Sequence, residues 1–159
     1  MDLGTAKFGR GLGLAVREPC TQRRNGSRIF RGIGSGRGLI DTAAHTLSFG
    51  NAGHPPPPVL RAATSTVDQL SLADPEPATG LIEDFDYTSH DRVFAPGDVF
   101  LGYTDGLFEA SDATANQFGE ARLRAYLAQR RGVPGAALLE GLVNEIVAFT
   151  GRAQFDDDI

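Results

Sequence analysis

Two short acidic segments carry the residue types that could do chemistry. Thr104-Asp105-Gly106 follows the apolar run Val99 to Tyr103, and Asp156 to Asp158 form an acidic run near the C-terminal end. Carboxylates that are brought together repel one another unless a cation lies between them. Their oxygens suit Mg²⁺ or Mn²⁺, and a pair of such ions activates water for phosphoester hydrolysis. In the simpler interpretation, Asp-Gly is a turn dipeptide and the acidic run is a solvated surface.

Several strands are expected to position Asp105. The run Val99 to Tyr103 predicts a buried strand that ends at Asp105, and Gly106 is expected to let the backbone turn tightly behind it. Upstream, residues 39–49 predict a hairpin, because short apolar stretches flank a polar turn. Pro55 to Pro58 are expected to end that pairing, since proline donates no ladder hydrogen bond.

The remaining elements are weaker strands and two helices. Short strands are predicted around residues 69–72 and 85–94. Residues 118–132 and 134–150 show apolar side chains at helical spacing. Pro134 is expected near the start of the second helix, and Gly151 is expected at its end.

Length and composition indicate one globular domain. The chain has 159 residues, 41% of them hydrophobic, and no apolar run reaches the roughly 20 residues that cross a bilayer. Its single cysteine, Cys20, excludes an internal disulfide and a metal site built of thiolates. A soluble cytoplasmic protein, with no membrane contact in this segment, is therefore expected.

Charge divides the chain into two unequal parts. Residues 1–38 carry a net charge of +6 and are rich in glycine and arginine, whereas residues 39–159 carry −11. Residues 1–37 show no sustained period, so they are expected to be disordered or not native to the fold. A basic arm that binds nucleic acid is the other interpretation, but scarce aromatic residues and the acidic body argue against a nucleic-acid partner.

Four motifs in order carry a family resemblance. They are "LSFGNAGHPPPPVLR", "PGDVFLGYTDGLFEA", "NQFGEARL" and "FDDDI". With them, residues 38–159 resemble the C-terminal portion of a bacterial PPM-type metal-dependent serine/threonine protein phosphatase, similar to sporulation stage II protein E and sigma-factor-regulating phosphatases. The resemblance implies an α+β fold, as a partial α-β-β-α sandwich of antiparallel sheets flanked by helices. It also implies two Mn²⁺ or Mg²⁺ ions.

The resemblance also implies site residues and a substrate. Asp105 matches a metal-ligating aspartate, and Asp157 matches the last metal ligand, with Asp158 as the alternative. Asn51, Gly53 and His54 match a segment at the edge of the site, without an assigned chemistry. Metal-activated water is the implied nucleophile, so no protein side chain is assigned as catalytic. The implied substrate is a phosphoserine or phosphothreonine protein, such as an anti-sigma-factor antagonist.

Departures from the family pattern leave a second function open. The Asp-x-x-Gly-His-Gly motif, which supplies further metal ligands in the family, does not occur in residues 1–159, and the end of the family's last strand is not found either. The chain is therefore expected to be the back half of a phosphatase domain in signal transduction. The alternative is an inactive fragment or pseudo-phosphatase that acts as a protein-binding module.

Overall fold

The computed structural model describes residues 15–17, 27–31, 36–72 and 74–152. In these residues the chain forms two four-stranded sheets and three helices, and every strand pair is antiparallel. The strands are β1 (Ala15–Arg17), β2 (Ser27–Arg31), β3 (Gly36–Asp41), β4 (Thr46–Asn51), β5 (Pro58–Leu60), β6 (Val67–Gln69), β7 (His90–Val93) and β8 (Val99–Leu101). The helices are α1 (Gly106–Glu109), α2 (Gly119–Ala128) and α3 (Gly135–Thr150).

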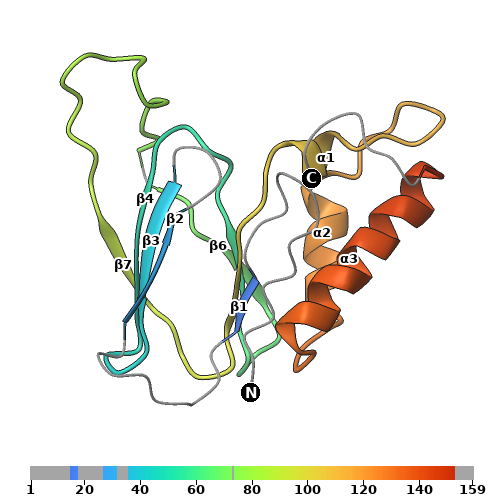
Figure 1. Cartoon of the computed structure of the whole chain (residues 1–159), viewed down its shortest axis with the longest axis horizontal. Helices are drawn as coiled ribbons and strands as arrows, with labels where there is room; N and C mark the ends of the chain where they lie inside the picture. Colours follow the sequence, from blue (N-terminus) through green and yellow to red (C-terminus); the bar gives the residue numbers. More distant parts are fainter. Residues whose placement is uncertain (1–14, 18–26, 32–35, 73, 153–159) are drawn as a thin grey trace.

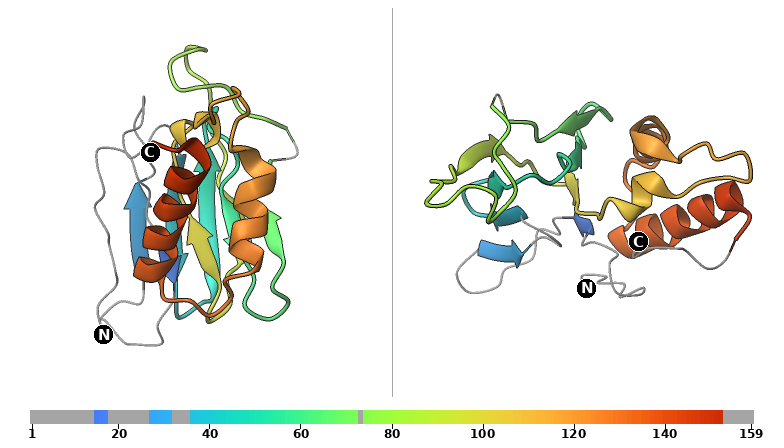
Figure 2. Two further views of the ribbon diagram at one scale, coloured as in Figure 1. Left: turned by 90° about the vertical axis from the view of Figure 1, so that its right-hand side faces the viewer. Right: turned by 90° about the horizontal axis from the view of Figure 1, so that it is seen from above.

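The elements lie in three layers. We call the sheet β1-β8-β5-β6 the inner sheet and the sheet β2-β3-β4-β7 the outer sheet. The inner sheet lies between the outer sheet and the layer of α2 and α3 (Figure 1; Figure 2, right). This α-β-β arrangement confirms the predicted α+β fold as a partial sandwich of antiparallel sheets flanked by helices.

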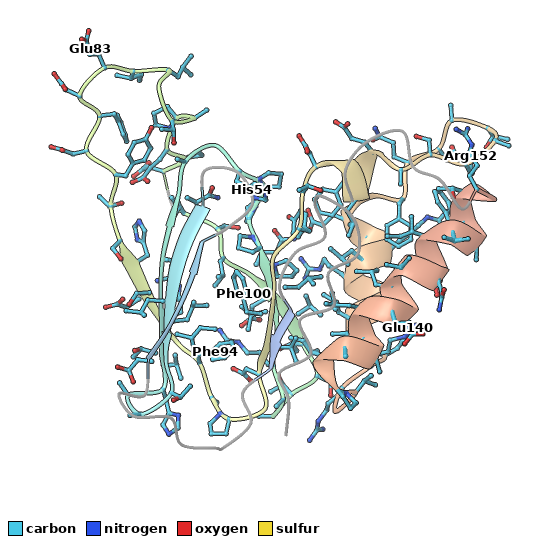
Figure 3. The ribbon with its side chains drawn as sticks, in the orientation of Figure 1. His54, Glu83, Phe94, Phe100, Glu140 and Arg152 are labelled. Carbon is cyan, nitrogen blue, oxygen red and sulfur yellow. The ribbon has the colours of Figure 1, made fainter. Side chains whose placement is uncertain are left out.

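Strand β8 is buried on both faces, which explains its uninterrupted apolar sequence. Phe100 packs between the two sheets, in a core with Ile40, Leu47 and Phe49 of the outer sheet. Its neighbours Val99 and Leu101 point the other way, because side chains alternate along a strand, and they pack in the core beneath the helices. Figure 3 shows Phe100 with Phe94, which belongs to the same core, in the space between the sheets.

The two long helices are amphipathic, as their sequence spacing predicts. The buried side chains of α3 are Leu138, Leu139, Leu142, Ile146 and Thr150. Pro134 is the N-cap of α3, and Gly151 ends the helix in the left-handed conformation, with φ of 69°. Both end signals are therefore confirmed. No helix among the described residues is long and apolar enough to span a membrane.

Before residue 38 the structure adds two strands that the sequence did not predict. Residues 1–37 were expected to be disordered or not native to the fold, and the described stretches Ala15–Arg17 and Ser27–Arg31 within them form β1 in the inner sheet and β2 in the outer sheet. Strand β2 pairs with β3 from Ser27–Asp41 to Arg31–Arg37, and β1 pairs with β8. The sequences of β1 and β2 show no alternating apolar pattern. They are strands because their backbones pair with β8 and β3, and such pairing does not require that pattern.

The predicted hairpin and the later strands are present, with shifted bounds. Strands β3 and β4 form the hairpin, and Asp41 Oδ1 accepts hydrogen bonds from the backbone N–H groups of Ala43 and Ala44 in its turn. The strand expected at residues 69–72 is β6, which starts two residues earlier and ends at Gln69, and residues 85–89 and 94 lie outside β7. That a domain begins at residue 38 stays a prediction.

Candidate functional site

Asp105 lies where β8 leads into the short helix α1. It is the N-cap of α1, and its Oδ1 accepts a hydrogen bond of 3.1 Å from the backbone N–H of Gly106. The Asp105 side chain is exposed, although the strand that leads to it is buried. Among the described residues, Asp105 makes no ion pair. Its carboxylate is therefore available to a cation from solvent.

Gly106 has a different role from the predicted one. It was expected to free the backbone for a tight turn, but it is the first residue of α1 and is buried, and its φ is not positive. A helix rather than a turn follows Asp105, because a carboxylate at an N-cap satisfies an orphan N–H and interacts favourably with the helix dipole.

A buried carboxylate fixes the other end of the same strand. Asp98, one residue before β8, is 2% exposed. Its Oδ1 accepts from the Ala62 backbone N–H at 2.8 Å, and its Oδ2 accepts from the Ala95 backbone N–H at 3.1 Å and from Arg61 Nη1 at 2.9 Å. These bonds tie the start of β8 to the end of β5, so they hold the strand that carries Asp105.

Two hydrogen bonds close the Asn51–His54 segment into a loop at the end of β4. Asn51 Nδ2 donates to the His54 carbonyl at 2.7 Å, and the His54 backbone N–H donates to Asn51 Oδ1 at 2.9 Å. Gly53 has a φ of 74°, and a Cβ there would lie 2.8 Å from the Cα of Ala78. Glycine is required at this position both by the backbone conformation and by the close approach of the residue-78 loop.

Tyr103 brings this loop against the end of β8. Its hydroxyl donates to the Pro56 carbonyl at 3.0 Å, and its ring centroid lies 5.7 Å from that of His54 and 4.7 Å from that of Phe108 in α1. Burial raises the pKa of Tyr103, so the hydroxyl remains a donor. His54 lies at the same end of the molecule as α1 (Figures 1 and 3).

The structure thus brings together two of the motifs that the sequence singled out, and places both beside Tyr103. Asp157 and Asp158 lie outside the described residues, so the structure does not test their place in the site. Sequence reasoning missed Tyr103, which it read only as the end of an apolar run. No local signal identifies a hydrogen bond between residues 47 positions apart.

The described residues offer one suitable ligand for a divalent cation but not a complete set. Asp105 offers an exposed carboxylate, the hard oxygen ligand that Mn²⁺ and Mg²⁺ prefer. In residues 36–72 and 74–152 no group of three or more His, Cys, Asp or Glu side chains is close enough to hold a metal ion. Asp105 therefore offers the chemistry of one metal ligand, and the described residues do not complete a site around it.

Comparison with solved structures identifies the class of fold. The chain is similar to the SiaA PP2C domain of Pseudomonas aeruginosa, with a TM-score of 0.63, 24% identity, and coverage of 77% of this chain and 47% of that one. It is also similar to the PP2C phosphatase domain and regulatory fragment of SpoIIE from Bacillus subtilis, with a TM-score of 0.62, 20% identity, and coverage of 77% and 35%. The fold is that of PP2C-type phosphatase domains.

The family follows from the sequence match. The stage II sporulation protein E family model matches residues 33–159, and the chain belongs to that family. It is also 31% identical over 121 residues to protein IcfG of Synechocystis, which covers 76% of this chain and 18% of IcfG. The chain thus spans less than a fifth of that relative and less than half of the two solved chains.

Proposed function

We propose that this chain is the C-terminal portion of a metal-dependent protein phosphatase domain, which hydrolyses phosphoserine or phosphothreonine in a signalling pathway. The observation that supports the proposal is the exposed, unpaired carboxylate of Asp105 at the end of β8, held beside the Asn51–His54 loop through Tyr103. Family membership supports the reaction class.

Asp105 and Asp157 are the proposed metal ligands, with Asp158 as the alternative to Asp157. A bound Mn²⁺ or Mg²⁺ would lower the pKa of a coordinated water, which supplies hydroxide for in-line attack on phosphorus. In this proposal Asp105 would offer Oδ2 to the ion, because its Oδ1 already accepts from the Gly106 N–H. Tyr103 packs the loop and α1 together and thereby holds Asp105 in place.

The proposed substrate is a phosphorylated protein, with an anti-sigma-factor antagonist as the candidate partner. One solved relative combines RsbU and RsbW domains of Rv1364c from Mycobacterium tuberculosis, at 21% identity and a TM-score of 0.54. A signalling role for the present chain agrees with such relatives. The cytoplasmic location expected from the sequence stays a prediction.

The experiment measures metal binding and turnover in the same samples. Mn²⁺ binding to the 159-residue chain and to its Asp105→Asn variant is measured by calorimetry, and hydrolysis of a phosphoserine peptide is measured with Mn²⁺ and with excess EDTA. We expect weak Mn²⁺ binding that the substitution reduces at least five-fold, because removing a charged oxygen ligand lowers the affinity of such sites. We expect little turnover by the chain alone.

A complete domain of the family tests catalysis itself. The same aspartate-to-asparagine change there should abolish most metal-dependent turnover, with little change in thermal stability. Glu120→Gln is the matched control in the chain, since Glu120 is an exposed carboxylate at the start of α2 whose one ion pair within the described part of the chain is with Arg124. Unchanged Mn²⁺ binding in Asp105→Asn would remove the metal role from Asp105. Robust metal-dependent turnover by the chain alone would overturn the view that it is an incomplete domain, and a complete domain without turnover would favour the protein-binding module.

A further inference from the structure

A groove between α2 and α3 holds two arginine side chains that the proposed phosphatase reaction does not use. Its volume is about 410 Å³, and its lining residues come mainly from these two helices. Arg122 and Arg130 line it from α2 and the turn after it, and Glu145, Ala148 and Phe149 line it from α3. The small side chain of Ala125 also lines the groove.

Both guanidinium groups are stacked on aromatic rings. Cζ of Arg122 lies 4.5 Å from the centroid of the Phe149 ring, and Phe149 in turn packs edge-on against Phe118. Cζ of Arg130 lies 3.7 Å from the centroid of the Tyr126 ring. A stacked guanidinium presents its N–H edge in a fixed plane, which is the geometry that binds a carboxylate through two parallel hydrogen bonds.

The two arginines differ in how far they are already engaged. Arg130 Nη1 donates to the Tyr126 carbonyl at 3.1 Å, and Nη2 lies 3.6 Å from Glu145 Oε2. The Tyr126 ring is itself fixed, because its hydroxyl donates to the Leu138 carbonyl at 2.6 Å. Arg122 makes no ion pair or hydrogen bond with any residue that the structure describes, so its N–H groups remain open to a ligand.

We propose that this groove binds an acidic segment of a protein partner, with a carboxylate on Arg122 and an apolar side chain beside Phe149. Glu145 lies in the same groove, so a dianionic phosphate would face a negative charge that a single carboxylate tolerates better.

The net negative charge of the chain allows specific binding of an acidic peptide to be told apart from non-specific electrostatic attraction. The chain has a net charge of −5, and residues 39–159 carry −11, so the protein as a whole repels an acidic peptide. Binding of such a peptide must therefore come from a local cationic site. The proposal stands apart from the metal site, because none of the groove residues lies in the loop or helix that carries Asp105 or His54.

The test uses a fluorescein-labelled six-residue peptide that alternates glutamate and leucine, and a second peptide with glutamine in place of glutamate. Fluorescence anisotropy with the 159-residue chain should show at least ten-fold tighter binding of the glutamate peptide. Arg122→Ala should weaken that binding at least five-fold. Arg131→Ala is the matched control, because Arg131 is an exposed neighbour of Arg130 that does not line the groove, and it should change binding less than two-fold.

Further measurements identify the site and its occupant. Far-ultraviolet circular dichroism confirms that the variants fold, and Arg122→Gln, which keeps most of the side chain, should weaken binding if Arg122→Ala does not fold. Equal binding of the two peptides, or equal losses in the Arg122 and Arg131 variants, would overturn the proposal. Displacement by low-millimolar inorganic phosphate would assign the groove to phosphate instead. Tighter peptide binding after neutralising Asp156 to Asp158 would show that the chain's own acidic segment occupies it.

Discussion

Replacing Asp98 by alanine should destabilise the protein strongly, although the residue lies outside the candidate site. Asp98 is the acceptor for two backbone N–H groups and for Arg61, and it is buried at the start of β8. Burial lowers the pKa of Arg61, but the hydrogen bonds and charges of Asp68 and Asp98 outweigh it and leave that pKa raised. Arg61 also donates to Asp68 and to the Val93 carbonyl, so the substitution leaves it partly engaged.

The size of the effect follows from the bonds that are lost. Each backbone N–H that loses its acceptor costs about 1 kcal/mol, and the charged hydrogen bond costs about 1.5–3 kcal/mol. The side chain of Arg61 is 21% exposed, so water offsets part of the second contribution. The expected loss in the free energy of unfolding is therefore about 3–4 kcal/mol, near the lower limit for breaking a buried pair.

Urea denaturation, followed by circular dichroism, measures this loss, and Asp98→Asn serves as a milder variant if Asp98→Ala does not fold. The matched control is Asp68→Ala, which removes the other carboxylate on the same guanidinium. The side chain of Asp68 is 47% exposed, so that change should cost less than about 1 kcal/mol despite its 2.6 Å contact. The expected difference rests on the burial of Asp98, so equal losses in the two variants would show that burial does not govern the strength of these interactions.

Three further predictions concern glycines and acidity. Gly53→Ala should lower the free energy of unfolding by about 2–4 kcal/mol, because the left-handed conformation and the contact with Ala78 both penalise a side chain. Gly151→Ala should cost only about 1–2 kcal/mol in the same urea measurement, since its φ is positive but nothing lies within 4 Å of the added atom, and equal costs would contradict the contact argument. Hydrogen bonds from Thr114 and Asn116 lower the pKa of Asp112 to about 2, so its stabilisation is present above about pH 4 and is lost as the pH falls towards 2. The stability difference between the protein and Asp112→Asn should therefore shrink over this range, and a difference that stays constant with pH would refute the assignment.

The sequence predicted those parts of the fold whose signals are local. Alternating or continuous apolar residues identified the β3–β4 hairpin and β8, and helical spacing identified α2 and α3. It did not predict β1 and β2, which are strands because of the partners they pair with rather than through a pattern of their own. It also assigned Gly106 to a turn, since the N-cap hydrogen bond of Asp105 cannot be read from an Asp-Gly pair.

For the candidate site, sequence by itself determined the position of Asp105 after a buried strand and the resemblance to PPM-type phosphatases. Only the tertiary structure decided that Asp105 is exposed, that Tyr103 joins the His54 loop to α1, and that Arg122 stacks on Phe149. The reason is that the His54–Tyr103 and Arg122–Phe149 contacts join residues 49 and 27 positions apart in the chain. Their energies depend on burial and geometry after folding, and so they leave no periodic trace in the amino-acid order.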